Sequence, residues 1–165
     1  MSRILFLDID GVLNSNFWND THQIEISDGT LIDEDKIKLL AQLVKRTKAK
    51  IILHSGWRFW FDSELKPLRI ESQRLIELLT KEDLSIDGLT PDLTTEEIRN
   101  NKRFSMVKAD EILLWLKLHD EVISWVVLDD LDLNNTQIEQ HQVKPNQKIG
   151  LTIDDINKAE QILLG

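Results

Sequence analysis

Cysteine is absent from the chain. A protein without thiols forms no disulfide scaffold, thiolate zinc site, iron–sulfur cluster or cysteine nucleophile, so these classes are excluded. We expect a cytoplasmic location, because the reducing cytoplasm needs no disulfides. Glycine and proline are scarce, at 6 and 3 of 165 residues, and no stretch rich in them marks a linker. Because ~100–200 residues usually form one domain, we expect a single domain over residues 1–165.

Long apolar runs are missing as well. The run at residues 4–7 stops at Asp8 and is too short for the apolar region of a signal peptide. Nowhere do ~18 apolar residues follow one another, as a membrane-spanning helix would require. Neither export nor a membrane partner is therefore expected.

Positive charge is in deficit. The chain has 20 Lys and Arg against 29 Asp and Glu, which gives a net charge of −9. Proteins that coat nucleic acids draw most of their affinity from cations facing phosphates, so this class is excluded. A local basic rim is still compatible with the sequence. Its candidate members are Arg58, Lys66, Arg69, Arg74, Lys102 and Arg103.

Short apolar segments and helical patterns alternate along the chain. The segments that predict strands are residues 4–7, 51–53, 84–89, 122–128 and 149–151. Apolar residues spaced three and four apart predict helices over 33–48, 70–81 and 106–118, and a last helix after an N-cap pair, Thr152 and Asp155. This alternation predicts an α/β fold, a doubly wound parallel sheet with helices on both faces. Its ligand is expected outside the carboxyl ends of the strands.

Polar residues follow three of the predicted strands. Asp8 and Asp10 come after the first, Ser55 after the second, and Asp129 and Asp130 after the strand at 122–128. Carboxylates crowded at one sheet edge repel one another, and a bound cation usually offsets that cost. Such oxygen ligands suit Mg²⁺, which also accepts phosphate oxygens. The sequence therefore predicts a metal-assisted phosphate site at this edge.

Four segments carry a family resemblance. Residues 6–14 (Phe-Leu-Asp-Ile-Asp-Gly-Val-Leu-Asn) resemble the first motif of the haloacid dehalogenase (HAD) superfamily. Residues 53–55 resemble its second motif, Lys108 at a helix start its third, and residues 127–130 its fourth. The resemblance spans essentially the whole chain and implies a HAD-like, Rossmann-type three-layer sandwich.

A narrower resemblance rests on further segments. They are the continuation Gly-Val-Leu-Asn, the run Ser55-Gly56-Trp57-Arg58, the helix with Glu111 and Trp115, and Gly150-Leu151-Thr152. These are similar to the small HAD domain of bacterial Swiss Army Knife RNA repair proteins. The resemblance implies a role in RNA repair.

The HAD resemblance implies a role for each motif residue. Asp8 would be the nucleophile that forms an aspartyl-phosphate. Asp10 would protonate the leaving alkoxide and then take a proton from the attacking water, which favours hydrolysis of a phosphoester. Ser55 and Lys108 would bind and neutralise the phosphoryl group, with Arg103 as the alternative to Lys108.

The resemblance also implies metal ligands and substrate contacts. Asp8, the backbone carbonyl of Asp10 and Asp129 would hold Mg²⁺, and Asp130 would be either a ligand or a residue that orients the ligands. Asp132 is a further candidate ligand. The candidate substrate contacts are Gly11, Ser55, Gly56, Arg58 and Lys108.

Two segments bear on the size of the substrate. The aromatic run at residues 57–61 either packs a helix onto the sheet or stacks on the bases of a nucleic acid. Residues 14–32 leave room for a hairpin flap but for no large folded cap. An open site of this kind suits a bulky substrate.

Together these residues predict a Mg²⁺-dependent phosphatase acting on a phosphomonoester, with an RNA or DNA terminal phosphate as the leading substrate. One alternative is a phosphatase for nucleotides or sugar phosphates. Another is a non-catalytic module that binds phosphate or a partner on the same scaffold. The intact set of Asp8, Asp10, Lys108 and Asp129 counts against this module, since binding alone needs no nucleophile.

Overall fold

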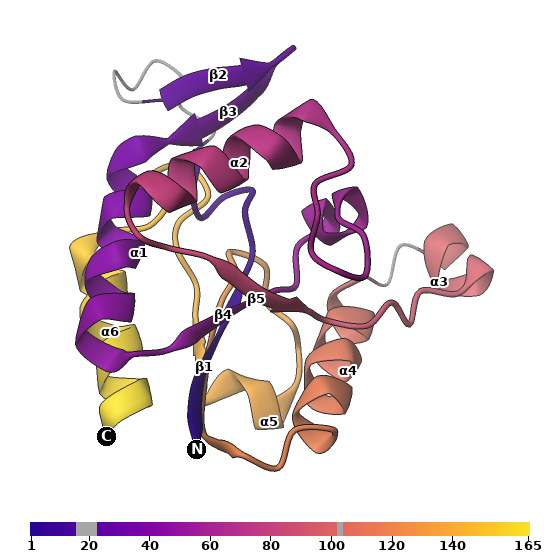
Figure 1. Ribbon diagram of the computed structural model, residues 1–165. Helices are drawn as coiled ribbons and strands as arrows, with labels where there is room; N and C mark the ends of the chain where they lie inside the picture. The colour runs from indigo at the N-terminus through magenta and orange to yellow at the C-terminus, as the bar shows by residue number, and fades with distance from the viewer. Residues whose placement is uncertain (16–22, 102–103) are drawn as a thin grey trace.

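A five-stranded sheet forms the centre of the computed structural model, which describes residues 1–15, 23–101 and 104–165 (Figure 1). Its neighbouring strands are all parallel, in the order β5-β4-β1-β6-β7. The strands are β1 (Ser2–Leu7), β4 (Lys50–Leu53), β5 (Ile86–Leu89), β6 (Val122–Leu128) and β7 (Gln142–Val143). The parallel α/β sheet predicted from the sequence is confirmed.

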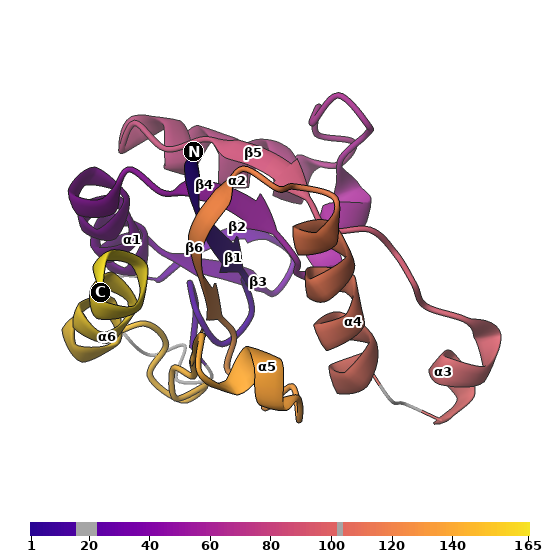
Figure 2. The same cartoon turned by 90° about the horizontal axis from the view of Figure 1, so that it is seen from below.

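Helices cover both faces of this sheet. The described helices are α1 (Glu34–Thr47), α2 (Ile70–Lys81), α3 (Glu96–Asn101), α4 (Phe104–Lys117), α5 (Thr136–Glu139) and α6 (Ile153–Leu164). Of these, α3 projects away from the sheet (Figure 1). Figure 2 shows α1 and α6 on one side of the sheet and α4 and α5 on the other, which makes three layers. Among the described residues, no helix combines the length and apolar character needed to cross a membrane.

The side chains of the central strand alternate between two hydrophobic cores. Leu5 and Leu7 of β1 belong to the core under α1, α2 and α6, whereas Ile4 and Phe6 belong to the core under α4 and α5. All four are buried, as expected for a strand covered on both faces. The ring of Phe6 meets that of Trp115 edge-on, with 5.4 Å between centroids. This packing fixes the frame from which the site residues extend.

Polar caps mark the starts of two long helices. Asp33 caps α1 by accepting a hydrogen bond from the N–H of Asp35. Thr152 and Asp155 form a capping box at α6, in which each side chain accepts a bond from the other residue's N–H. The helix start predicted at Thr152 is confirmed.

The strand predicted at residues 149–151 is wrong. The fifth strand is instead β7, which pairs with the end of β6. Residues 149–151 reach across to the loop after β1, where the N–H of Leu151 donates to the carbonyl of Val12 (2.9 Å). Gly150 has a φ of +80°, and a Cβ on it would lie 2.9 Å from the carbonyl oxygen of Asn14. The apolar pattern therefore reflects burial of Leu151 by this loop and not a place in the sheet.

An antiparallel hairpin follows the loop after β1. Its strands β2 (Gln23–Ser27) and β3 (Thr30–Asp33) lie next to α2 (Figure 1). The side-chain amide of Asn14 donates to the carbonyl of Leu31 (2.9 Å) and ties the hairpin to the loop. This is the flap expected within residues 14–32, of which 16–22 lie outside the described residues. The described part of the chain holds no larger cap.

Candidate active site

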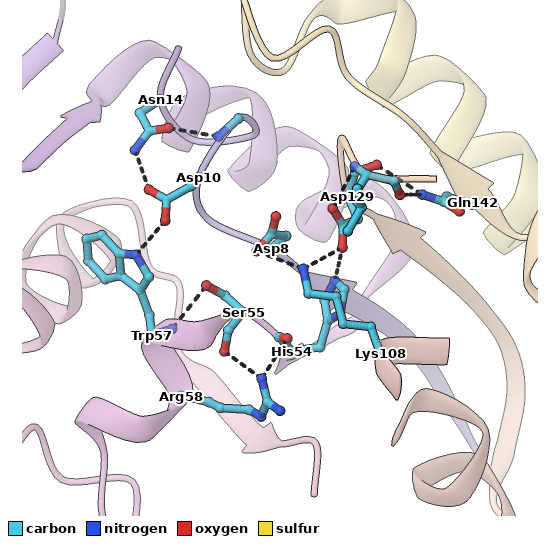
Figure 3. A network of polar contacts seen from close by, with 12 residues as sticks. Asp8, Asp10, Asn14, His54, Ser55, Trp57, Arg58, Lys108, Asp129 and Gln142 are labelled. Carbon is cyan, nitrogen blue, oxygen red and sulfur yellow. Dashed lines mark hydrogen bonds and ion pairs between the residues drawn. The ribbon is translucent and has the colours of Figure 1, made fainter. Parts of the chain in front are cut away.

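The carboxyl ends of three adjacent strands bring the predicted polar residues together (Figure 3). β4, β1 and β6 are neighbours in the sheet, and within two residues of their ends come Ser55, Asp8 and Asp129. Backbone pairing continues into this region, where the N–H of Asp8 donates to the carbonyl of Leu128 (3.0 Å). The side chains therefore extend from a fixed backbone.

Three of the carboxylates form a cluster that can hold a cation. Asp8, Asp129 and Asp130 each offer one oxygen, and these atoms lie within 4.8 Å of one another. Asp8 and Asp129 are buried, whereas Asp130 is half-buried. Hard oxygen donors of this kind suit Mg²⁺. The side chain of Asp10 bonds elsewhere, so only its backbone carbonyl remains a candidate ligand.

Burial and repulsion oppose ionisation of two members of this cluster, Asp8 and Asp130, whereas His54, Lys108 and the N–H of Leu131 outweigh burial at Asp129 and lower its pKa. Burial raises the pKa of Asp8 well above its usual value, and Asp129 raises it further. Burial and the charge of Asp129 also raise the pKa of Asp130. A bound cation would reverse both shifts, because it stabilises the ionised carboxylates. The electrostatics of the cluster thus fit a divalent metal ion.

Lys108 reaches the cluster from α4. Its Nζ lies 2.9 Å from Oδ2 of Asp129 and 3.8 Å from Oδ1 of Asp8. Burial acts to lower the pKa of Lys108, but the two carboxylates outweigh it and raise the pKa, so the ammonium group stays charged. This charge lies where it can neutralise a group bound to Asp8. Arg103, the alternative to Lys108, lies outside the described residues.

Contacts that the sequence does not reveal hold Asp129 in place. Its Oδ1 accepts from the N–H of Leu131 (2.9 Å), and the side-chain amide of Gln142 in β7 donates to its backbone carbonyl (3.1 Å). Nε2 of His54 lies 3.5 Å from its Oδ2. Burial lowers the pKa of His54 to about 3, so this imidazole is neutral near pH 7. Sequence reasoning missed Gln142 because β7 was not predicted.

Gly11 lets Asp130 approach the loop after β1. The φ of Gly11 is +81°, and a Cβ on it would lie only 2.5 Å from Oδ2 of Asp130. Both the backbone conformation and the space therefore require a residue without a side chain. The substrate contact predicted for Gly11 remains a prediction beside this structural role.

Gly11→Ala is expected to lower the free energy of unfolding by about 1–2 kcal/mol, because a left-handed backbone is costly for a residue with a Cβ. The methyl group also displaces Asp130. We therefore expect that Mg²⁺ raises the melting temperature of the variant only at higher concentrations than it does for the wild type. Urea unfolding and Mg²⁺ titration of the melting temperature measure the two effects. Gly29→Ala is the matched control, since Gly29 has a φ of +72° but open space around its Cβ. An equal Mg²⁺ response in both variants would argue against a metal-site role for Asp130.

Asp10 lies exposed at the edge of the site with both carboxylate oxygens in hydrogen bonds (Figure 3). Oδ1 accepts from the side-chain amide of Asn14 (3.0 Å), and Oδ2 accepts from the indole N–H of Trp57 (3.1 Å). The sequence predicts the place of Asp10 beside Asp8 but neither of these partners. Trp57 is separated from Asp10 by 47 positions, and no local pattern links them.

Ser55 begins a short 3-10 helix, η1 (Gly56–Trp60). Its Oγ accepts from the N–H of Trp57 (3.1 Å). A hydroxyl that accepts in this way still has a hydrogen to donate, and Ser55 lines the same cleft as Asp8 and Lys108. The capping role is therefore compatible with the predicted contact to a phosphoryl oxygen.

The guanidinium of Arg58 has partners within the protein, and its contact with the substrate remains a prediction. Its guanidinium is buried, pairs with Glu111 (2.7 Å) and donates to the carbonyls of His54 and Ser55. Glu111 also accepts from the N–H of Leu93 (2.9 Å). Because a buried charge needs such partners, Arg58 is committed to fastening η1 to α4. A Trp-Arg pair in the sequence does not reveal an acidic partner 53 positions away.

The aromatic run at residues 57–61 is divided between packing and exposure. Trp57 and Phe61 belong to the hydrophobic core, so the packing interpretation holds for them. Trp60 packs on Trp57 with 4.8 Å between ring centroids. Phe59 is 52% exposed, and the guanidinium of Arg58 lies over its ring at 4.5 Å from the centroid.

The predicted basic rim carries less free charge than the sequence suggests. Lys66 and Arg69 each pair with an acidic side chain two residues away, at 3.2 and 3.4 Å. Lys102 and Arg103 lie outside the described residues. Arg58 is also paired, with Glu111, so Arg74 is the one described rim residue without an ion pair and little unpaired positive charge is left to attract a polyanion.

A cleft of about 360 Å³ joins the site residues. Most of the predicted site residues line it: Asp8, Asp10, Gly11, Ser55, Gly56, Lys108, Asp129 and Asp130. Arg58 and Asp132 do not line it, and Arg103 lies outside the described residues. Leu131 and Gln147 also line it, and the sequence did not single them out. A carboxylate nucleophile, an ammonium group and a cation-binding cluster thus share one open cleft.

A family model matches most of the chain. The model describes the HAD domain in Swiss Army Knife RNA repair proteins, and it matches residues 4–156. These residues include every lining residue of the cleft. No curated protein and no solved structure matches the chain.

Proposed function

The chain belongs to the family of HAD domains in Swiss Army Knife RNA repair proteins, and from this premise we propose that it is a Mg²⁺-dependent phosphatase. It hydrolyses a phosphomonoester through an aspartyl-phosphate on Asp8. The family indicates phosphatase or hydrolase chemistry. One arrangement carries the proposal: the carboxylate of Asp8 lies 3.8 Å from the ammonium group of Lys108 and within the acidic cluster of Asp129 and Asp130.

The donors of the site fit Mg²⁺, which HAD proteins generally use. Asp8, Asp129 and Asp130 would hold it together with the backbone carbonyl of Asp10. Burial first, and then the negative charge of Asp129, raise the pKa values of Asp8 and Asp130, and a cation would oppose both effects. When bound, Mg²⁺ supplies positive charge that screens the phosphate oxygens from an anionic nucleophile.

The first chemical step uses four residues, which are Asp8, Asp10, Ser55 and Lys108. A carboxylate oxygen of Asp8 attacks phosphorus, the bond from phosphorus to the ester oxygen breaks, and its electron pair stays on that oxygen. Asp10 gives this oxygen a proton, so the leaving group departs as an alcohol. Lys108 and the hydroxyl of Ser55 stabilise the charge on the phosphoryl oxygens.

The second step regenerates the enzyme. Asp10, now a carboxylate, takes a proton from a water molecule whose oxygen attacks phosphorus. The bond between phosphorus and Asp8 breaks, its electron pair returns to the carboxylate, and inorganic phosphate leaves. Asp10 is protonated again and Asp8 is ionised, so both residues are ready for another substrate.

The open cleft supports an RNA or DNA terminal phosphate as the leading substrate. In the described part of the chain the one insertion beside the site is the hairpin of β2 and β3. A bulky leaving group therefore meets no folded cap. The family's place in RNA repair proteins favours the same class. The net charge of −9 and the paired rim cations favour the second candidate, a nucleotide or sugar phosphate.

Hydrolysis of p-nitrophenyl phosphate tests the chemistry before the substrate is known. We expect turnover with Mg²⁺, loss of turnover with EDTA, and recovery when excess Mg²⁺ is restored. The same assay with 3′-phosphorylated oligonucleotides, 5′-phosphorylated oligonucleotides and small phosphoesters ranks the substrates.

The proposal fails if folded protein binds Mg²⁺ and hydrolyses none of these compounds. The binding module would then be the better explanation of the cleft. Equal and poor rates on both kinds of oligonucleotide, beside faster turnover of small phosphoesters, would contradict only the nucleic-acid substrate.

A further inference from the structure

Two side chains fix the carboxyl group of Asp10, one from η1 and one from its own loop. The indole N–H of Trp57 donates to its Oδ2 (3.1 Å), and the amide of Asn14 donates to its Oδ1 (3.0 Å). Trp57 is only 4% exposed and is part of the core, so its ring has one position. An exposed group on a loop is thus oriented by a buried side chain.

Both partners of Asp10 can only donate. An indole nitrogen has no acceptor site, and neither has an amide nitrogen. The amide of Asn14 is held in this orientation because its oxygen accepts from the N–H of Gly11 (2.8 Å) and its nitrogen also donates to the carbonyl of Leu31 (2.9 Å). A proton on Asp10 cannot be shared with Trp57 or Asn14, so it is left for a group in the cleft.

We propose that Trp57 is a positioning residue, whose indole N–H aims the carboxyl group of Asp10 at the leaving-group oxygen. This inference rests on the proposed phosphatase function. In the first step the bond from phosphorus to the ester oxygen breaks as that oxygen receives the proton of Asp10, which becomes a carboxylate. In the second step Asp10 takes a proton back from water. Without the N–H of Trp57 the carboxyl group rotates, and proton transfer loses its alignment.

The need for a proton depends on the leaving group. The p-nitrophenolate ion is stable and departs with little help, whereas the phenolate ion is more basic and needs a proton in the transition state. A misaligned Asp10 therefore slows the hydrolysis of phenyl phosphate more than that of p-nitrophenyl phosphate. A fault in the nucleophile, the metal site or the fold slows both reactions alike.

Trp57→Phe removes the N–H and keeps an aromatic ring. We expect kcat/KM for phenyl phosphate to fall about tenfold or more and kcat/KM for p-nitrophenyl phosphate less than about threefold, since a positioned acid contributes ~10²–10⁴-fold. The comparison uses kcat/KM because this constant reports the first step, in which the leaving group departs, and not the second step, which both substrates share. Trp60→Phe is the matched control: Trp60 lies in the same helix and packs on Trp57, yet within the described residues it makes no hydrogen bond to Asp10. In this control the ratio of kcat/KM for phenyl phosphate to kcat/KM for p-nitrophenyl phosphate should stay at the wild-type value.

A second variant covers the case in which Trp57→Phe does not fold. Benzothienylalanine at position 57 replaces the N–H with sulfur and keeps the shape of the ring, so it removes the hydrogen bond alone. Asp10→Asn combined with either change gives a further readout. If Trp57 acts through Asp10, the Asp10→Asn variant has the same ratio of kcat/KM for the two substrates whether or not Trp57 is also altered.

Three results would overturn the inference. Equal losses on both substrates, or no loss on either, would make Trp57 a packing residue only. Wild-type protein that hydrolyses p-nitrophenyl phosphate but not phenyl phosphate would show that no proton is delivered for Trp57 to aim. Wild-type protein without any turnover would instead overturn the proposed function, and the inference with it.

Discussion

Asp8→Asn is expected to lower the rate of p-nitrophenyl phosphate hydrolysis by at least ~10³-fold while the protein stays folded. A carboxamide does not attack phosphorus as a carboxylate does, so no aspartyl-phosphate forms. Asn has nearly the shape of Asp, so the packing around this buried position is kept. Steady-state rates and circular dichroism measure the two expectations. A variant that keeps substantial activity would exclude Asp8 as the nucleophile.

The same variant should be more stable than the wild type when metal is removed. Burial raises the pKa of Asp8, so the native state binds its proton more tightly than the unfolded chain does. Above the ordinary pKa of Asp, the wild type therefore loses stability as pH rises, and Asn avoids this loss. We expect a higher urea midpoint for the variant at pH 7 in EDTA. Asp110→Asn, on the exposed face of α4, is the control for removal of one negative charge.

Asp129→Asn is expected to raise the Mg²⁺ concentration for half-maximal activity by ~10–100-fold or more, because even residues around metal ligands affect metal affinity to that extent. The substitution also weakens the contact that holds Lys108 at 2.9 Å, so the maximal rate should fall. Mg²⁺ titrations followed by activity and by calorimetry separate affinity from rate.

Asp132→Asn is the matched control for Asp129→Asn. Asp132 follows β6 as well and was a candidate ligand, but its carboxylate is exposed and pairs with Lys144 at 3.3 Å. Within the described residues it is not part of the acidic cluster. We expect an unchanged Mg²⁺ requirement in this control. The same result in Asp129→Asn would exclude Asp129 as a ligand.

The sheet and the cleft were predictable because both depend on strong local signals. The apolar runs of β1 and β6 end in acidic residues, and parallel strands bring their carboxyl ends to one edge. The two-residue strand β7 and the short helices α3 and α5 gave no comparable signal. β7, α3 and α5 were therefore missed, and the apolar residues at 149–151 were assigned to a strand in place of β7.

The partners of polar side chains could not be predicted. Arg58 pairs with Glu111 across 53 positions, and Trp57 bonds to Asp10 across 47. Spacing in the sequence places a residue on an element, but the choice of partner depends on how the elements pack. Neither the pairing of Arg58 with Glu111 nor the hydrogen bond of Trp57 is therefore predictable from the sequence.

The bond between Leu151 and Val12 has a consequence for synthesis on the ribosome. A growing chain that ends before residue 150 already contains every residue that lines the cleft, yet it lacks the segment that closes on the loop after β1. That loop carries the nucleophile and the acid, so their alignment waits for residues 149–151 to dock. Catalytic competence is therefore expected only after these residues have been synthesised, when the sheet already has the strands it needs.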